Sequence, residues 1–160
     1  MVLILILVLI SCFFLVIFVG APYLPTLNSQ INNAFKVGHI KKGQTIIELG
    51  CGDGKVLLAA ARKGINVVGY EVNPVLFAVA YLRTIKYRSR VKVIWGNYWL
   101  KDWPEADVIF VFLVQRYMKK LDKKCMQYPH KPVKLLSFAF TIPDKNLAGK
   151  KGGIYYYRYD

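Results

Sequence analysis

The sequence predicts an α/β fold with a Rossmann-like, mostly parallel sheet that ends in an antiparallel strand. Three observations predict it. The apolar segment 44–49 has the character of a buried strand, and it runs into the turn Gly50-Cys51-Gly52-Asp53-Gly54. The amphipathic segment 55–63 follows as a helix, and a second apolar strand, 66–72, carries Glu71. Strand, glycine turn, helix, strand and acid, in that order, are typical of half of a nucleotide-binding sheet.

The remaining elements follow from similar patterns. Asn73-Pro74 starts a helix, because proline is favoured in a first helical turn, and the helix is expected to reach residue 88. Strands are expected over 91–95, 106–113 and 133–140, and the second of these is the nearly unbroken apolar run of a central parallel strand. The other expected elements are helices over 28–37 and 116–126 and a last strand over 154–159.

The first twenty residues differ in composition from the rest. From Val2 to Val19 every residue except Ser11 is apolar, and the first charge is Lys36. Such a run is long enough to cross a bilayer as a helix, although a secretory signal is the alternative. We therefore expect an anchor over 1–20, a linker and cofactor-capping segment over 21–43, and the nucleotide-binding domain over 44–160. Because lysines follow the run and no charge precedes it, we expect a single-pass membrane protein whose domain faces the cytoplasm.

Charge and cysteine content bear on partners and compartment. The net charge of +14 predicts an anionic partner, either lipid head groups or nucleic acid, unless the lysines merely form a solvated surface. For a protein held at a membrane, membrane lipid is the simpler partner, and no nucleic acid is expected. Cys12, Cys51 and Cys125 show no pairing pattern, which indicates a reducing compartment.

The glycine spacing indicates which nucleotide binds. The pattern is G-x-G-x-G rather than the G-x-G-x-x-G of dinucleotide sites, and Glu48 stands two residues before its first glycine. A carboxylate there suits a ligand with a cationic end, such as S-adenosylmethionine, better than a pyrophosphate. Glu71, 23 residues further on, ends the second strand, where its oxygens can accept both ribose hydroxyls.

Four segments match a known family: 23–26, 48–54, 69–74 and 107–113. They resemble class I methyltransferases and, more narrowly, the membrane-tethered protein lysine methyltransferases of the ATP synthase c-subunit and the adenine nucleotide translocase. The resemblance covers about residues 22–160. It departs from the family at Val114-Gln115, where relatives often have a proline, and it is loose over 138–143.

The resemblance implies roles for individual residues. Glu71 would hold the ribose, Asn97 would contact the adenine amine, and Tyr23 and Thr26 would close over the cofactor. The methionine end would lie against the loop, whose expected cofactor-binding residues are Glu48, Gly50, Cys51, Gly52, Asp53 and Gly54.

Methyl transfer needs few acid–base residues, so the sequence defines the residues around the methyl acceptor less well than those around the cofactor. Asp107 and Tyr23 are the candidate catalytic residues. Asp107 could equally serve as a cap at the start of its strand. Trp99 or Trp103 could line the entrance for the methyl acceptor, or could simply pack in the core or at a membrane interface. His39 and His130 lack partners at metal spacing, so no metal is expected.

The expected acceptor is a protein substrate with a target lysine, in membrane or membrane-associated proteins. A nucleobase acceptor is disfavoured, because Phe112-Leu113-Val114-Gln115 stands where such enzymes carry an Asn/Asp-Pro-Pro-aromatic stretch. A lipid or small amine is the enzymatic alternative. A cofactor-binding module without activity is the non-enzymatic one.

Overall fold

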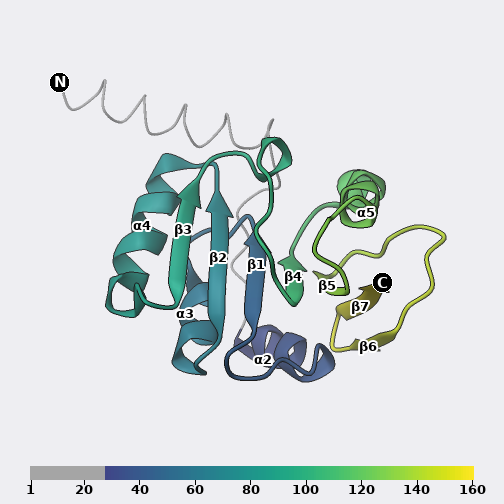
Figure 1. The fold of residues 1–160 in the computed structure, drawn as a ribbon, viewed down its shortest axis with the longest axis horizontal. Coiled ribbons are helices and arrows are strands. Elements are labelled where there is room, and N and C mark those ends of the chain that lie inside the picture. Colours follow the sequence, from purple (N-terminus) through teal and green to yellow (C-terminus); the bar gives the residue numbers. More distant parts are fainter. Residues whose placement is uncertain (1–27) are drawn as a thin grey trace.

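The computed structural model describes residues 28–160, which form a seven-stranded sheet with helices on both faces (Figure 1). In chain order the elements are α2 (Asn28–Val37), β1 (Thr45–Leu49), α3 (Lys55–Arg62), β2 (Asn66–Glu71), α4 (Pro74–Thr84), the 3-10 helix η1 (Ile85–Tyr87), β3 (Val91–Trp95), the 3-10 helix η2 (Tyr98–Leu100), β4 (Val108–Val111), the 3-10 helix η3 (Gln115–Tyr117), α5 (Met118–Met126), β5 (Val133–Phe138), β6 (Gly149–Lys151) and β7 (Ile154–Tyr159).

The strand order is β3-β2-β1-β4-β5-β7-β6. The first five strands in this order are parallel, whereas β7 runs antiparallel to both of its neighbours, β5 and β6. The chain winds outward from β1 to β3 and then returns to place β4 on the other side of β1. In open parallel sheets such a reversal opens a crevice at the carboxyl ends of the two central strands, here β1 and β4.

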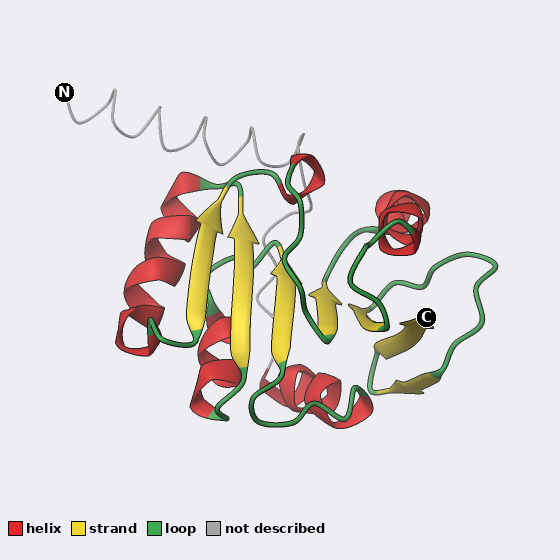
Figure 2. Cartoon of the chain, viewed as in Figure 1, coloured by secondary structure: helices red, strands yellow, loops and turns green. Residues whose placement is uncertain are grey.

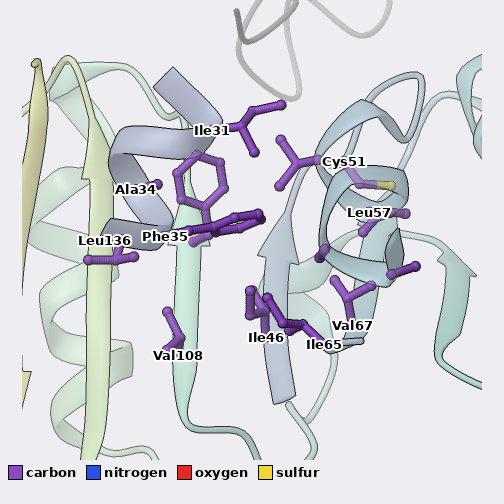
Figure 3. Packing of buried hydrophobic residues seen from close by; sticks show 14 of the residues in the cluster. Ile31, Ala34, Phe35, Ile46, Cys51, Leu57, Ile65, Val67, Val108 and Leu136 are labelled. Carbon is purple, nitrogen blue, oxygen red and sulfur yellow. The ribbon is translucent and has the colours of Figure 1, made fainter. Parts of the chain in front are cut away.

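Two hydrophobic cores sandwich the sheet, because neighbouring residues of a strand point to opposite faces. On one face, Ile46 and Val108 pack with α2, α3 and Ala80 of α4 (Figure 3). On the other face, Ile47 and Ile109 pack with Leu121 of α5. Three helices therefore pack against one face of the sheet, and α5 packs against the other.

Most of the predicted elements are present, with shifts of one or two residues at several ends, and the helix expected to reach residue 88 ends at Thr84 and continues as the 3-10 helix η1. The 28–37 helix, the 91–95 strand and the 154–159 strand have the predicted bounds. The prediction missed β6, which forms a hairpin with β7 after the long loop seen in Figure 2. The turn is Gly152-Gly153, with φ of +54° and +78°, and a two-glycine turn of this kind is a recognised hairpin signal that was overlooked.

The predicted membrane localisation needs correction. The expected anchor, residues 1–20, lies outside the described residues. Within residues 28–160 no helix is long and apolar enough to cross a bilayer. The expectation of a single-pass membrane protein is therefore wrong for the part of the chain that the structure describes.

Candidate active site

The glycine loop lies at the carboxyl ends of β1 and β2. The N–H groups of Gly50 and Cys51 both donate to the Tyr70 carbonyl oxygen, at 3.0 and 2.8 Å, and these bonds hold the loop against β2. Gly50 has a φ of +83°, a left-handed conformation that favours glycine, and a Cβ at this position would meet no atom of residues 28–160 within 4 Å. Within this part of the chain, the loop therefore leaves its backbone uncovered at the end of β1.

Gly54 has a packing role at the start of α3. Its φ is +77°, and a Cβ there would lie 2.9 Å from both Cα and Cβ of Ala80 on α4. The start of α3 therefore approaches α4 more closely than a side chain would permit. The role that the resemblance implies for Gly54, lining the methionine end of a cofactor, stays a prediction beside this structural role.

Glu71 anchors the glycine loop through its carboxylate. Oε2 accepts from the Gly52 N–H and Oε1 accepts from the Asn73 N–H, each at 2.8 Å. Burial raises the pKa of Glu71, and the hydrogen bonds from the backbone N–H groups of Asn73 and Gly52 oppose that rise. Since each carboxylate oxygen has two acceptor directions, one on each oxygen remains for further donors.

Glu48 is a buried carboxylate with an unpartnered oxygen. Its side chain is 5% exposed, and its Oε2 has no hydrogen-bond partner among the described residues. Burial raises the pKa of Glu48 well above its usual value, and the charges of Glu71 and Asp53 raise it further. A buried carboxylate without a partner is costly unless a ligand supplies the donor, and an ammonium group would do so.

The other predicted cofactor residues lie around the same edge. Cys51 is buried beside Glu48, and burial raises the pKa of its thiol. Asp53 forms an ion pair with Arg83 of α4 and also accepts from the Lys55 N–H at 3.3 Å. Asn97 follows β3, where its Oδ1 accepts from the Trp99 N–H at 3.0 Å. Asp53 and Asn97 thus have local partners, and their cofactor roles stay predictions. Tyr23 and Thr26 lie outside the described residues.

Asp107 lies at the opposite edge of the sheet, where the strands begin. Its Oδ2 accepts from the Thr45 N–H at 2.7 Å, and its Oδ1 accepts from Nε2 of Gln44 at 3.2 Å. Thr45 starts β1 and Leu49 ends it, and four residues of strand separate the two edges by roughly 13 Å. The structure favours the strand-capping alternative for Asp107, because its carboxylate joins β4 to β1 far from the glycine loop.

An open groove of about 620 Å³ also lies at this amino-end edge. It is lined by Thr45, Glu105, Ala106, Asp107, Pro129, His130, Lys131 and Pro132. No group of three or more His, Cys, Asp or Glu side chains in residues 28–160 is placed to hold a metal ion. Glu48, Glu71 and the glycine loop all lie at the other edge.

Aromatic side chains gather where β4 and β5 end. Phe112, just after β4, lies 4.7 Å from Phe138 and 6.5 Å from Phe140, measured between ring centroids, and all three rings are half-buried. A second group, Tyr98, Trp99 and Tyr117, joins η2 to η3. Burial, with Tyr117 and Glu71 nearby, raises the pKa of Tyr98. The carboxyl edge therefore combines carboxylates with aromatic walls.

Comparison with known proteins defines the family. The model of the ANTKMT methyltransferase domain matches residues 48–148, which include Glu48, the glycine loop and Glu71. The chain belongs to this methyltransferase family. The resemblance drawn from the sequence motifs is thereby confirmed. The predicted cofactor, S-adenosylmethionine, is the cofactor of this family.

Individual relatives agree with the family. The human ATP synthase c-subunit lysine N-methyltransferase is 30% identical over 126 residues, covering 76% of this chain and 53% of the human protein. The chain thus spans about half the length of this relative. A protein-lysine N-methyltransferase from Saccharolobus islandicus (strain REY15A) is 28% identical, covering 76% of this chain and 78% of that protein.

Solved structures share the fold. An RNA methyltransferase from Salinibacter ruber in complex with S-adenosyl-L-homocysteine has a TM-score of 0.77 at 21% identity, covering 85% of this chain and 92% of that one. A methyltransferase from Thiobacillus denitrificans in complex with the same ligand has a TM-score of 0.60 at 18% identity, covering 76% and 53%. At these identities the likeness establishes the class I methyltransferase fold.

The family's residues fit S-adenosylmethionine. The unpartnered oxygen of Glu48 suits the ammonium group, and the free acceptor directions of Glu71 suit the two ribose hydroxyls. The open space at Gly50 permits close approach to its backbone. The fit rests on one buried polar atom that the described residues leave without a partner.

Sequence reasoning missed how the site is positioned. Asn73 was identified as the start of a helix, but its N–H also orients Glu71 while its Oδ1 accepts from the N–H groups of Val75 and Leu76. The Phe112, Phe138 and Phe140 group was missed as well. Aromatic residues directly after two neighbouring parallel strands were the available signal, because those strand ends meet at one edge.

Proposed function

We propose that the chain is an S-adenosylmethionine-dependent protein-lysine N-methyltransferase. The observation that carries the proposal is the unpartnered, buried oxygen of Glu48 beside Glu71, in a chain of the ANTKMT methyltransferase family. A buried acid that lacks a donor needs a cationic ligand, and the family's cofactor has a cationic end.

The proposed acceptor follows from the relatives' names. Those names specify lysine N-methylation, on the ATP synthase c-subunit in four mammalian and amphibian relatives and on adenine nucleotide translocase in a mouse relative. We extend only the chemistry to this chain, namely transfer to a lysine side chain of a protein. Acceptors among membrane or membrane-associated proteins remain a prediction.

The rings of Phe112, Phe138 and Phe140 are the proposed wall of the acceptor mouth. They lie at the carboxyl ends of β4 and β5, on the sheet edge that also holds Glu48. Aromatic faces attract a lysine cation as it arrives. The apolar surroundings then favour the neutral amine, because desolvation lowers the pKa of a buried lysine.

The chemistry requires alignment above all. The bound cofactor supplies a methyl group on a positively charged sulfur. The lysine would first release a proton to solvent, and its neutral nitrogen would then take up the methyl group that the cofactor supplies, which would leave S-adenosylhomocysteine as the product. The residues of this chain contribute by fixing both partners: Glu71 and Glu48 for the cofactor, and the three Phe rings for the amine. Asp107 has no part in this step.

Cofactor binding is tested by calorimetry on the full chain. S-adenosylhomocysteine should bind and NAD should not, because the loop has no G-x-G-x-x-G pyrophosphate site. Binding of NAD without binding of the adenosyl ligand would overturn the cofactor assignment.

Transfer is tested separately with a methyl-labelled cofactor. Lysine-containing peptides and a lipid extract are incubated with the enzyme, and label is followed by mass spectrometry. Label on lysine Nζ supports the proposal. Label only in lipid moves the assignment to a lipid amine, and cofactor binding without any transfer indicates a non-enzymatic module.

A further inference from the structure

A basic surface lies beside the proposed acceptor mouth. It consists of the exposed side chains of Arg116, Lys119, Lys120 and Lys123 on η3 and α5, and we call it the α5 basic surface. Residues 112–143 hold seven Lys or Arg residues and one acid, Asp122, which is a net charge of +6. The positive charge of the chain is thus concentrated on the segment that follows the mouth.

The single acid of this segment does not neutralise the surface. Asp122 Oδ1 accepts from the Tyr159 hydroxyl at 2.6 Å and pairs with Lys145 Nζ at 3.0 Å. The ion pairs found in residues 28–160 include none of the four cations of the α5 basic surface. Their charges therefore face solvent, where an anionic partner can reach them.

Aromatic contacts hold two of these cations in place. Lys120 Nζ lies 4.5 Å from the centre of the Trp99 ring, and the Arg116 guanidinium lies 4.8 Å from the Tyr117 ring. Lys119 and Lys123 are one helical turn apart on α5. A cation held by a ring loses less side-chain freedom when it binds, which suits a docking surface.

The surface adjoins the mouth through η3. Gln115, the first residue of η3, follows Phe112 by three positions and donates from its Nε2 to the Thr141 carbonyl oxygen at 3.0 Å. Tyr117 lies 6.2 Å from Trp99 between ring centroids. Phe112 is thus four residues before Arg116 along the chain, and Phe140 adjoins η3 through its neighbour Thr141.

The charge of the surface is opposite to that of the site behind it. Glu48, Glu71 and Asp53 supply carboxylates at the glycine loop, whereas the rim carries lysine and arginine. The interior carboxylates attract the side chain of a target lysine, and the α5 basic surface at the rim attracts acidic residues beside that lysine. Phosphate-rich partners would bind the rim only, because the interior carboxylates repel phosphates.

We infer that the α5 basic surface binds acidic residues that flank the target lysine, an inference that rests on the proposed function. The enzyme thereby selects a lone lysine in an acidic polypeptide segment. Lysines among other lysines or arginines are repelled by the rim before they reach the mouth.

The test compares two peptides of equal length, each with one lysine, whose flanks are acidic in one and basic in the other. The acidic-flanked peptide should have a kcat/KM about tenfold higher at low salt, and added salt should erase the difference. In the variant K119E/K123E the preference should vanish or invert, and in K119Q/K123Q it should shrink.

A charge-matched control separates the local surface from net charge. The variant K63E/K86E replaces exposed lysines after α3 and in η1. It lowers the net charge from +14 to +10, as K119E/K123E does, since two Lys→Glu changes remove four charges. The control should keep the wild-type preference. Binding of S-adenosylhomocysteine by every variant serves as the check on folding.

The outcomes are distinguishable. Equal kcat/KM for both peptides, or equal effects of the two double Glu variants, would overturn the docking inference and leave lysine methylation standing. If neither peptide is methylated while RNA or anionic vesicles with amine head groups are, both the inference and the proposed function fail.

Discussion

The two edges of the sheet hold carboxylates in different ways. At the amino-end edge, both oxygens of Asp107 accept from neighbours on the β1 side, and a groove lies alongside. At the carboxyl edge, Glu71 also accepts two N–H groups, but Glu48 keeps one buried oxygen without a partner among the described residues. An acid whose partners are all within the fold stabilises the fold. An acid that lacks a partner is prepared for a ligand.

The largest expected loss of unfolding free energy is that of Gly54→Ala, at the carboxyl edge, and Gly43→Ala at the amino-end edge is its comparison. Gly54→Ala places a Cβ 2.9 Å from Ala80 in a left-handed conformation, so overpacking of about 1–3 kcal/mol adds to backbone strain of about 1–2 kcal/mol. Gly43→Ala, near the start of β1, has a φ of +88° and open space around its Cβ, so it should cost only the strain. Urea unfolding of both variants measures the difference, and equal losses would contradict the packing role of Gly54.

Glu71→Ala should have the next largest effect. It removes the acceptor for the Gly52 and Asn73 N–H groups and for the ribose hydroxyls, so S-adenosylhomocysteine affinity should fall by about 1–3 kcal/mol. Calorimetry measures it. Unchanged affinity would exclude Glu71 as the ribose ligand.

Glu48→Gln should raise the thermal stability of the free protein and lower its affinity for the cofactor. The pKa of Glu48 is raised in the folded state, so between its unfolded value of 4.5 and its folded pKa the native state binds more protons and stability falls as pH rises. The neutral Gln escapes this loss, so the variant should have a higher Tm than the wild type at pH 8 and little advantage at pH 4.5 or below.

The same substitution should weaken cofactor binding. The ammonium group loses its carboxylate partner, and a charged hydrogen bond contributes about 1.5–3 kcal/mol. Thermal melts with and without S-adenosylhomocysteine test both statements. A Tm difference that does not change with pH would show that Glu48 is not the source.

Asp107→Ala should weaken the fold and leave the chemistry intact. The Thr45 N–H loses its acceptor, which costs about 1–2 kcal/mol of unfolding free energy. Cofactor affinity and kcat should match the wild type. Should Asp107→Asn keep cofactor binding and lose transfer, the capping role would be insufficient and a catalytic role would be restored.

The smallest effect is expected for the Asp53–Arg83 ion pair. The Arg83 side chain is 37% exposed, and partly exposed pairs contribute about 0.2–1 kcal/mol. Arg83→Ala should therefore change unfolding free energy slightly. A much larger loss of cofactor affinity in Asp53→Asn than in Arg83→Ala would support the predicted cofactor role of Asp53.

Local pattern was sufficient for most of the fold. The apolar run around Ile46 and Ile47, the Asn73-Pro74 helix start and the glycine turn each depend on neighbours within a few residues, so the local sequence encodes them. The β6–β7 hairpin was missed because three residues of strand carry little periodicity, although Gly152-Gly153 marked its turn.

For this protein, the sequence alone determined the family and the cofactor class, and it predicted Glu48 and Glu71 as cofactor-binding acids, because motif spacing along one strand–turn–helix–strand unit encodes them. Only the tertiary structure supplied the contacts that favour the capping alternative for Asp107, and only it brought Phe112, Phe138 and Phe140 together. The reason is strand direction. Asp107 and Phe112 are five positions apart in sequence, yet they begin and end the same strand region, so parallel pairing sends one to each edge of the sheet.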